Sequence, residues 1–209
     1  NIQVVLGAGS YICGEETAIL NSIEGQRPET RHKPPYPSEF GLYGEKTCIN
    51  NIETLCRISL IFEDDYDNDL LLFSISGDVQ NPGVYEEKQG ITLGYLSEKV
   101  GAIDPKAIFF CASGGCIPFK KDLILSCKEI SKTGNFFQTG IIFVNHERSI
   151  TDTCRSITQF FNDENCGKCL PCREGNFRLL QLFQVILERK WTKEEFQIMQ
   201  DLVDFIPNG

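Results

Sequence analysis

The sequence predicts an α+β protein made of several domains, because three stretches of the chain differ in character. Residues 1–69 begin with a short apolar run, a glycine-rich segment and a helical stretch. Residues 70–147 combine strand-like runs with one helix, and residues 148–209 repeat apolar side chains at helical spacing. With 209 residues, 41% of them hydrophobic, the chain is long enough for one to three compact units.

The first stretch is expected to run strand, loop, helix. Ile2–Leu6 is an apolar run suited to a buried strand, and the glycine-rich segment Gly7–Gly14 follows it. A helix is expected from Glu15, and Gly25 suits its left-handed C-terminal cap. A strand, a glycine loop and a helix N-terminus in this order are a reasonable geometry for a nucleotide site.

A long loop follows this helix. Residues 26–47 are rich in Pro and Gly, and loops of this length are usually functional or disordered. Apolar side chains are expected to anchor it as an ordered loop around a site: Tyr36, Phe40, Leu42 and Tyr43. A second helix is expected next, with Asn50 or Asn51 as its N-cap. The acidic run at 63–69 is expected to be a linker.

The middle stretch is expected to form a small ubiquitin-like roll. Asn81–Gly83 is a strong turn signal, and Leu93–Val100 is expected to be its helix. The strand-like runs are Leu70–Ile75, Val84–Tyr85, Ala107–Phe110 and Gly140–Val144.

The last stretch is expected to form a helical bundle, because apolar side chains recur every three or four residues. Thr192 and Glu195 have the spacing of a capping box at the start of the third helix. The apolar faces of the first two helices are Ile150, Cys154, Ile157 and Phe161, and then Phe177, Leu180, Phe183 and Leu187.

Composition excludes several classes of protein. A net charge of −9 argues against nucleic acid as the main partner, and no apolar run approaches the ~20 residues of a membrane-spanning helix. Ten cysteines beside a large aliphatic content indicate a reducing compartment better than a secreted disulfide framework. The scattered cysteines are expected to be small buried side chains: Cys48, Cys56, Cys111, Cys116 and Cys127.

The clustered cysteines carry the clearest chemistry. Cys166, Cys169 and Cys172 are each separated by two residues, so one tight loop can bring a thiolate to three corners of a four-iron, four-sulfur cluster. Gly167 permits a tight turn, and Cys172 is expected at the N-terminus of the next helix, which favours a thiolate. Lys168 and Arg173, which flank the middle and last cysteines, would partly offset the cluster's negative charge.

The metal and its fourth ligand stay open at this point. Zinc is the main rival of iron, although structural zinc sites usually combine two separated pairs of ligands. The ferredoxin pattern places a fourth Cys where this chain has Asn176. Cys154 is a possible substitute, but it also fits the apolar face of its helix.

A pair of acids follows the glycine-rich segment. The spacing of Gly9 and Gly14 superficially matches a phosphate loop, but Glu15 stands where such a loop needs Lys. Glu15 and Glu16 are candidates to accept hydrogen bonds from ring N–H, amide or ribose hydroxyl groups of a nucleotide. An equally simple interpretation is that they only favour the helix dipole in the first turn.

These segments together resemble the flavin-bearing, NADH-oxidising subunit of respiratory complex I, a module that also occurs in NAD-linked hydrogenases and formate dehydrogenases. The resemblance covers essentially the whole chain. The motifs that carry it, in order, are Gly7–Ala18, Lys33–Pro37, Gly41–Gly44, Ile49–Leu55 and Asn165–Gly175.

The resemblance implies an NADH dehydrogenase subunit that takes hydride from NADH onto FMN and passes single electrons to a 4Fe-4S cluster, toward quinone or another acceptor. It implies catalytic roles for Tyr11, Glu15 and Glu16. The residues implied at FMN and NAD(H) are Gly14, Glu15, Glu16, Asn50, Asn51 and Thr54, and the implied iron ligands are Cys166, Cys169 and Cys172.

It also implies domains, partners and a location. Residues 1–69 would be the C-terminal part of a Rossmann-like flavin domain, and residues 70–147 a soluble-ligand-binding (SLBB) β-grasp domain, with Ile75–Tyr85 carrying that likeness. Residues 148–209 would be a truncated helical iron–sulfur domain. The implied partners are a thioredoxin-like 2Fe-2S subunit and a larger iron–sulfur subunit. The location would be cytoplasmic, peripheral to the membrane through those partners.

Two departures qualify the resemblance. The family's earlier glycine-rich flavin and NADH loop is absent from this sequence, and its fourth cluster cysteine is expected beyond Gly209. The chain alone is therefore expected to be inactive. The alternatives are a diaphorase subunit of a hydrogenase or formate dehydrogenase, an electron-transfer and docking module without its own substrate site, and a zinc-stabilised interaction protein.

Overall fold

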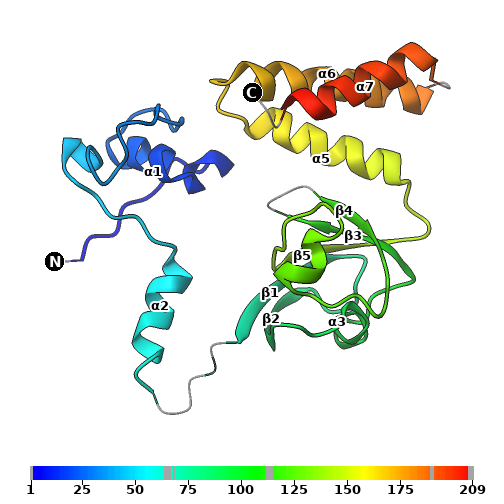
Figure 1. The fold of residues 1–209 in the computed structure, drawn as a ribbon, viewed down its shortest axis with the longest axis horizontal. Coiled ribbons are helices and arrows are strands. Elements are labelled where there is room, and N and C mark those ends of the chain that lie inside the picture. Colours follow the sequence, from blue (N-terminus) through cyan, green and yellow to red (C-terminus); the bar gives the residue numbers. More distant parts are fainter. Residues whose placement is uncertain (1, 64–66, 68, 112–114, 189–190, 207–209) are drawn as a thin grey trace. The chain divides into compact units, whose positions relative to one another are not determined.

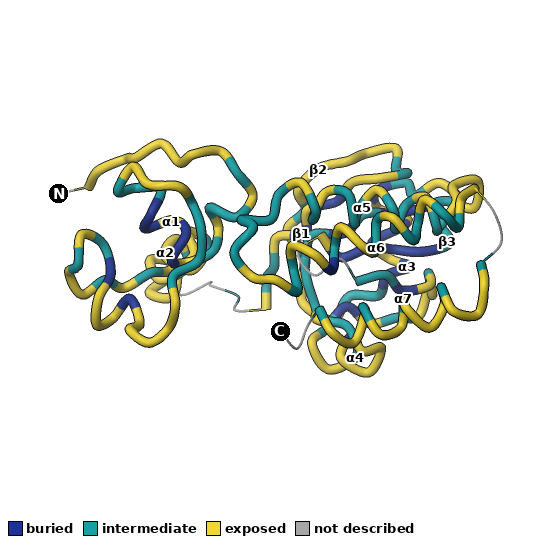
Figure 2. The backbone as a smooth tube through the Cα atoms, turned by 90° about the horizontal axis from the view of Figure 1, so that it is seen from above, coloured by how far each residue is buried: buried dark blue, intermediate teal, exposed yellow. Residues whose placement is uncertain are grey.

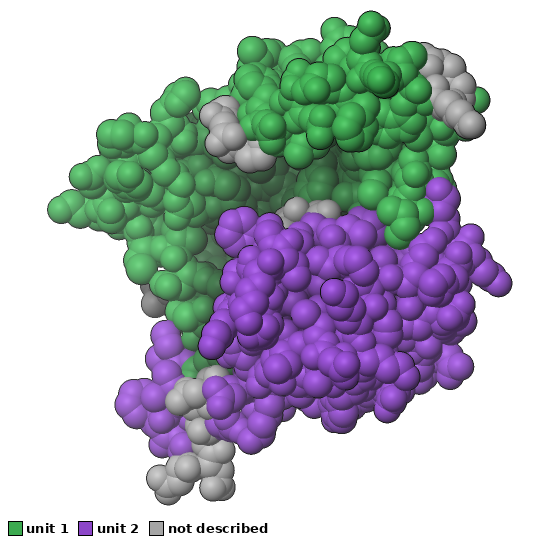
Figure 3. All heavy atoms as spheres, turned by 45° about the vertical axis from the view of Figure 1, so that its right-hand side comes forward, with its two compact units in different colours: residues 1–57, 150–209 green, residues 58–149 purple. Residues whose placement is uncertain are grey.

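The protein has a mixed α/β fold that divides into two compact units. The computed structural model describes residues 2–63, 67, 69–111, 115–188 and 191–206, and these contain a five-stranded sheet and seven α-helices. One unit comprises residues 1–57 and 150–209, and the other residues 58–149 (green and purple in Figure 3). Two segments that are distant in sequence therefore share one unit.

The sheet of unit 58–149 is mixed. Its strands follow the spatial order β2-β1-β5-β3-β4, with β1 and β5 parallel and the other neighbours antiparallel (Figure 1). Their bounds are β1 (Leu70–Gly77), β2 (Gly83–Lys88), β3 (Pro105–Phe110), β4 (Cys116–Pro118) and β5 (Gly140–Asn145). The predicted strand positions and the turn at Asn81–Gly83 are confirmed. The short β4 was not expected, and neither was the five-residue helix α4 (Cys127–Ser131).

One hydrophobic core holds this unit together. Helix α3 spans Leu93–Val100 as predicted and buries Leu93, Leu96 and Val100, whose spacing of three and four residues places them on one face. Thr92 caps its N-terminus, and Gly101 ends it with φ +64°. The strands contribute Phe73, Ile75, Ile108, Phe110, Ile117, Ile141 and Phe143 to the same core.

An ion pair tethers the end of this unit. Asp78, after β1, accepts hydrogen bonds from Arg148 Nε at 2.8 Å and from the backbone N–H of Asn145 at 3.0 Å. The Arg148 hydrogen bond lowers the pKa of the Asp78 carboxyl, and it outweighs the opposing effect of burial. A carboxyl with a lowered folded pKa stabilises the fold above its unfolded value of about 3.9, and that contribution is lost as pH falls through the folded value.

We therefore expect Asp78→Asn to lower the unfolding temperature at neutral pH by a few degrees. The unfolding temperature of the variant should also fall less than that of the wild type as the pH is lowered. The effect is modest because Arg148 is largely exposed. Thermal unfolding followed across pH measures it, with Asp122→Asn, an exposed aspartate of the same unit, as the control. If the unfolding temperature of Asp78→Asn falls in acid as steeply as that of the wild type, the Asp78–Arg148 pair does not have this role.

Helix α1 (Glu16–Ile23) organises the start of the other unit. Glu15 is its N-cap, and Gly25, with φ +74°, follows its C-cap as predicted. The strand expected at Ile2–Leu6 is wrong, because these residues have no regular structure and Leu6 is 91% exposed. A strand needs a neighbour to receive its hydrogen bonds, and the described part of the chain pairs none with this run.

The loop at 26–47 is ordered by polar contacts and not by its aromatic side chains. Arg31 donates from Nε to Asn21 Oδ1 at 2.8 Å, from Nη1 to the carbonyl of Gly41 at 3.1 Å, and from Nη2 to Glu24 Oε2 at 2.8 Å. The predicted anchors are exposed by 54% at Tyr36, 56% at Phe40 and 71% at Tyr43. The anchoring hypothesis is therefore wrong, although Leu42 is partly buried.

Helix α2 (Ile52–Leu60) follows this loop. Asn51 Oδ1 accepts from the backbone N–H of Glu53 at 2.8 Å, which confirms Asn51 as one of the two candidate caps. Every residue of α2 is described, and none of them is buried. The predicted acidic linker lies partly outside the described residues, since 64–66 and 68 are not among them.

The C-terminal helices are long but thinly packed. They are α5 (Ile150–Glu164), α6 (Leu170–Glu188) and α7 (Lys193–Phe205), and the predicted capping box of Thr192 and Glu195 is confirmed. Only Gly175 is buried among their described residues. Figure 2 shows these helices mostly in the colours of intermediate and exposed residues. Parts of the predicted apolar faces are exposed, including Phe177 and Leu187. In the described chain, no helix combines the length and the apolar composition that crossing a membrane requires.

The scattered cysteines correct another expectation. Cys48, Cys56, Cys111 and Cys127 are exposed, and Cys116 is only partly buried. They lie in loops, in short elements or on α2, outside the regular apolar pattern that marks the core. The prediction that these cysteines are buried is therefore wrong, because it rested on residue type alone.

Candidate functional site

The three clustered cysteines lie where α5 gives way to α6. Gly167 has φ +78°, a left-handed conformation that favours glycine, and it turns the chain between Cys166 and Cys169. The carbonyl of Cys169 accepts from the backbone N–H of Arg173 at 3.0 Å, which opens α6. Cys172 therefore lies in the first turn of α6, as predicted, near free helical N–H groups.

Positive side chains surround the backbone of this loop. Arg27 Nη2 donates to the carbonyl of Cys166 at 3.2 Å, and Arg173 Nη1 donates to that of Gly167 at 2.8 Å. Lys168 Nζ donates to the carbonyl of Thr30 and lies 3.8 Å from Glu29. The loop is thus fixed both by its own helix and by residues 27–30.

The donor set fits an iron–sulfur cluster. Burial is the largest cause that raises the pKa of the Cys172 thiol, and the charges of Cys166 and Cys169 raise it further. Among the described residues, no three of His, Cys, Asp and Glu converge on a position for a single metal ion. In a cubane cluster each thiolate binds a different iron, so three cysteines of one loop can each supply one ligand.

Two side chains bear on the ligand count. Asn176, at the ferredoxin position, donates to the carbonyl of Cys172 at 2.8 Å and lies 3.5 Å from its Sγ. Cys154 is partly buried within the regular turns of α5, and burial raises the pKa of its thiol. The sequence left two roles open for Cys154, a fourth ligand or a residue on the apolar face of its helix. In the structure it is a partly buried side chain on α5, which agrees with the second role.

The two acids make different contacts: Glu15 caps helix α1, whereas Glu16 forms an exposed ion pair. Glu15 Oε2 accepts from the backbone N–H groups of Thr17 at 2.9 Å and Ala18 at 2.8 Å, and from Thr17 Oγ1 at 2.6 Å. Burial opposes ionisation of Glu15, yet these hydrogen bonds and the charge of Lys33 together keep its pKa below the usual value. Glu16 is exposed and pairs with Lys33.

Glu15 therefore stabilises the first turn of α1, as the helix-dipole interpretation expects. Its second carboxylate oxygen, Oε1, takes no part in the cap. Its Oε1 faces Lys33 Nζ at 3.4 Å, and the same ammonium pairs with Glu16. Glu16 accepts no hydrogen bond from the backbone among the bonds of the described residues, so its carboxylate is the freer of the two.

A pocket of about 550 Å³ brings one acid, Glu15, and one of the three cysteines, Cys169, to one place. It lies within unit 1–57 and 150–209, and Glu15 and Lys33 line it together with Lys168 and Cys169. The remaining lining residues are Thr30, Arg31, His32 and Pro171. Two motifs separated by about 150 positions in the sequence thus border the same hollow.

Tyr11 and Gly14 lie beside this arrangement in the 3₁₀ turn Tyr11–Gly14. The backbone N–H of Tyr11 donates to Glu164 Oε2 at 2.9 Å, and its ring meets that of Phe160 edge-on with centroids 5.0 Å apart. Apart from Gly14 itself and its two chain neighbours, no described residue has an atom within 4 Å of the position where a Cβ on Gly14 would stand, so the chain borders open space there.

Of the predicted site residues, Glu15 and Cys169 line this pocket, whereas Tyr11, Gly14, Glu16, Cys166 and Cys172 are not among its lining residues. Asn50, Asn51 and Thr54 are exposed, and they are not among the residues that line it. Asn51 caps α2, and Asn50 Nδ2 lies 3.2 Å from Cys48 Sγ.

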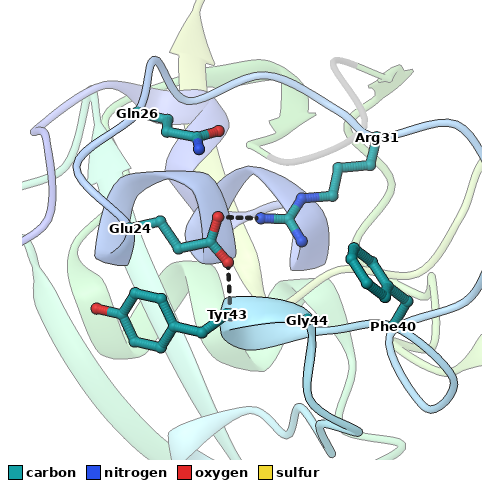
Figure 4. A pocket seen from close by; sticks show the side chains of 6 residues that line it. All are labelled: Glu24, Gln26, Arg31, Phe40, Tyr43 and Gly44. Carbon is teal, nitrogen blue, oxygen red and sulfur yellow. Dashed lines mark hydrogen bonds and ion pairs between the residues drawn. The ribbon is translucent and has the colours of Figure 1, made fainter.

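A second pocket, of about 680 Å³, was not expected from the sequence. Glu24 holds Arg31 through one carboxylate oxygen and the backbone N–H of Tyr43 through the other, at 2.8 Å each (Figure 4). Arg27 and Lys33 were missed as well. Their contacts join residues far apart in the chain, and a single sequence carries no signal for such pairs.

Comparison with known proteins identifies both halves of the site. Residues 1–60 match the family model of the Nuo51 FMN-binding domain, and residues 152–209 match that of the NADH-ubiquinone oxidoreductase-F iron-sulfur binding region. Curated relatives cover the whole chain. The F subunit of NADH-quinone oxidoreductase from Buchnera aphidicola is 34% identical over 100% of this chain and 51% of its own length.

Other relatives work in a different setting. The alpha subunit of the NAD-reducing hydrogenase HoxS from Cupriavidus necator is 35% identical over 95% of this chain and 34% of its own length. Among solved structures, the NAD+-reducing NiFe hydrogenase in the H2-reduced state matches with a TM-score of 0.86 and 27% identity, over 98% of this chain and 38% of that one.

The chain spans about half the length, or less, of the curated relatives that it matches. Within that span the two matched regions hold the acid pair and the cysteine cluster, and each contributes one residue, Glu15 and Cys169, to the pocket of about 550 Å³. The chain therefore belongs to the family that includes the F subunit of NADH-quinone oxidoreductase and the alpha subunit of NAD-reducing hydrogenase.

Proposed function

We propose that the complete gene product is an NADH dehydrogenase subunit that takes hydride from NADH onto FMN and passes single electrons to a 4Fe-4S cluster. The observation that carries the proposal is the pocket lined by both Glu15 and Cys169. Such a pocket gives a flavin-side carboxylate and a cluster ligand a common border. Electrons transferred at this border would have a short path between the two centres.

The proposed roles of the chain's own residues follow from their contacts. FMN supplies a centre that accepts hydride, and the cluster supplies a one-electron acceptor. Glu16, the freer carboxylate, would accept hydrogen bonds from the nicotinamide or a ribose, while Lys33 fixes its orientation. Glu15 would present Oε1 to the same region while its other oxygen caps α1. Tyr11 and Gly14 would border the flavin at the open side of the 3₁₀ turn.

Cys166, Cys169 and Cys172 would hold three irons, and the fourth ligand would come from a cysteine outside these three. Asn50, Asn51 and Thr54 would contact FMN along the α2 side of the unit. This part of the proposal rests on the family motif, because these residues do not line the described pocket.

The domain division that goes with this function has three parts. Residues 1–69 would complete a Rossmann-like flavin domain, residues 70–147 would be a soluble-ligand-binding β-grasp domain, and residues 148–209 the cluster domain. The sheet order β2-β1-β5-β3-β4 with parallel β1 and β5 and one main helix supports the β-grasp assignment.

Two settings are compatible with the site. The respiratory setting is supported by the NADH-quinone oxidoreductase relatives, and the alternative, a diaphorase subunit of a hydrogenase, is supported by the HoxS relative and the hydrogenase structures. In either setting the partners would be a thioredoxin-like 2Fe-2S subunit and a larger iron–sulfur subunit. The location would be cytoplasmic, at the membrane only through those partners. A pure electron-transfer and docking module would lack NADH–ferricyanide activity, which makes that assay decisive between the classes.

The test begins with the complete gene product purified without oxygen. We expect bound FMN, roughly four irons with as many sulfides per chain, and NADH–ferricyanide activity. A colourless protein that contains zinc would overturn the proposal in favour of the zinc-stabilised interaction protein.

Glu16→Gln provides a sharper test of the acid pair. We expect NADH turnover at low substrate to fall about tenfold with iron content unchanged, because a hydrogen bond to a partly exposed charged group contributes about 1.5 kcal/mol. Steady-state kinetics and iron analysis measure the two quantities. Glu86→Gln, an exposed glutamate on β2, is the control. Wild-type kinetics in Glu16→Gln would count against the assigned role.

A further inference from the structure

Residues 27–30 and the cysteine loop hold each other through reciprocal bonds. Arg27 reaches from the first segment to the carbonyl of Cys166, and Lys168 reaches from the loop back to the carbonyl of Thr30. The partners are 139 and 138 positions apart in the sequence. Neither bond belongs to a helix or a strand, so both are specific links between the two segments.

Of the described cations around the loop, Arg27 is the one whose charge has no acidic partner. Lys168 lies 3.8 Å from Glu29, and Arg173 Nε lies 3.1 Å from Glu174, so those charges are partly offset. The ion pairs of the described residues include none that involves Arg27. A guanidinium stays charged at every physiological pH, so this positive charge is permanent.

The same guanidinium lies close to the turn of the loop. Arg27 Nη2 is 3.2 Å from the carbonyl oxygen of Cys166 and 4.0 Å from the position that a Cβ on Gly167 would occupy. It therefore lies against the peptide that follows the first proposed ligand. A group that hydrogen-bonds a ligand residue orients that ligand, and its charge acts on the metal centre through a short distance.

We infer that Arg27 is a positioning residue for the cluster: it fixes the Cys166 peptide and raises the reduction potential of the cluster by its unpaired positive charge. The inference rests on the proposed function. Reduction adds one negative charge to the cluster, and a permanent positive charge nearby stabilises the reduced form more than the oxidised form. Arg27 belongs to residues 1–60, which match the FMN-binding domain, so one matched region tunes the cluster held by the other.

The test compares charge-removing and charge-keeping variants in the complete gene product. Arg27→Gln should lower the one-electron midpoint potential by about 59 mV, equivalent to a tenfold change in the equilibrium constant, while iron content is retained. Arg27→Lys should keep the wild-type potential, because the charge remains. Arg155→Gln removes the same charge from an ion pair on α5 and should leave the potential unchanged. Redox titration followed by electron paramagnetic resonance gives the potentials.

Each outcome supports or overturns the inference. An unchanged potential in Arg27→Gln with full iron content overturns it, and so does an equal fall in Arg27→Lys. Should Arg27→Gln lose iron, Arg27→Lys decides: it should keep both the iron and the wild-type potential, because it keeps the charge. Loss of iron in both variants overturns the inference as well. A wild-type protein without any iron–sulfur cluster would instead overturn the proposed function itself.

Amide hydrogen exchange of the metal-free protein tests the positioning role without the cluster. The amides of 166–169 should exchange faster in Arg27→Gln than in the wild type, because the Cys166 peptide loses its only external donor among the described bonds. Equal exchange in the two proteins would remove the positioning half of the inference.

Discussion

Cys169→Ser in the complete gene product is expected to reduce the iron content from roughly four atoms per chain to near zero, because a cubane cluster needs a thiolate at each iron. Cys169 is the most informative of the three cysteines. It lines the pocket beside Glu15, and its carbonyl opens α6, so its backbone is held whichever side chain it carries. Iron and acid-labile sulfide analysis after anaerobic purification measures the loss.

Cys154→Ser is the matched control for that experiment. Cys154 lies within α5, and its thiol is partly buried among helical neighbours. We expect its variant to keep the full iron content. A Cys169→Ser protein that still holds four irons would contradict the ligand assignment, whereas iron loss in Cys154→Ser would identify Cys154 as the fourth ligand.

Phe143→Ala is expected to destabilise unit 58–149 by about 3–5 kcal/mol, the cost of removing a large aromatic side chain from a packed core. Phe143 is 1% exposed on β5, which pairs with both β1 and β3. Its loss therefore opens a cavity at the centre of the sheet. Denaturant titration followed by hydrogen exchange in the strands measures the free energy of unfolding of this unit.

Phe136→Ala removes the same side chain from a position that is 77% exposed. Its effect should stay within about 0.5 kcal/mol, as for most surface substitutions. Equal losses in the two variants would mean that the core does not lie where the sheet places it.

The elements that the sequence predicted correctly are those with local signals. Helix α3 has its cap residues and its apolar spacing within ten residues, and the turn at Asn81–Gly83 is written in consecutive residues. β4 and α4 were missed because three and five residues are too short to show a period. The expected strand at Ile2–Leu6 failed for the opposite reason, since an apolar run says nothing about whether a partner strand is present.

In the candidate site, too, the features with local sequence signals were predicted and the contacts between distant residues were not. The cysteine spacing and the turn at Gly167 are local, and the structure places the turn where it was expected. The structural role of Glu15 was also foreseeable, because an acid before a helix favours its first turn. The contact of Arg27 with Cys166 was not, because no pattern within a single sequence links positions so far apart.

The division of the chain into units has a consequence for the order in which a nascent polypeptide acquires structure. The contacts of unit 58–149 lie within about 90 consecutive residues, whereas the first 57 residues find partners such as Glu164 and Cys166 only at the end of the chain. Because domains fold as they leave the ribosome, residues 58–149 can complete their fold while residues 1–57 still wait for residues 150–209. Residues 2–6, with their exposed apolar side chains, belong to the part that waits longest. A chaperone that protects apolar segments during synthesis would therefore stay bound to residues 2–6 until residues 150–209 are made, and deletion of residues 150–209 should prolong that interaction.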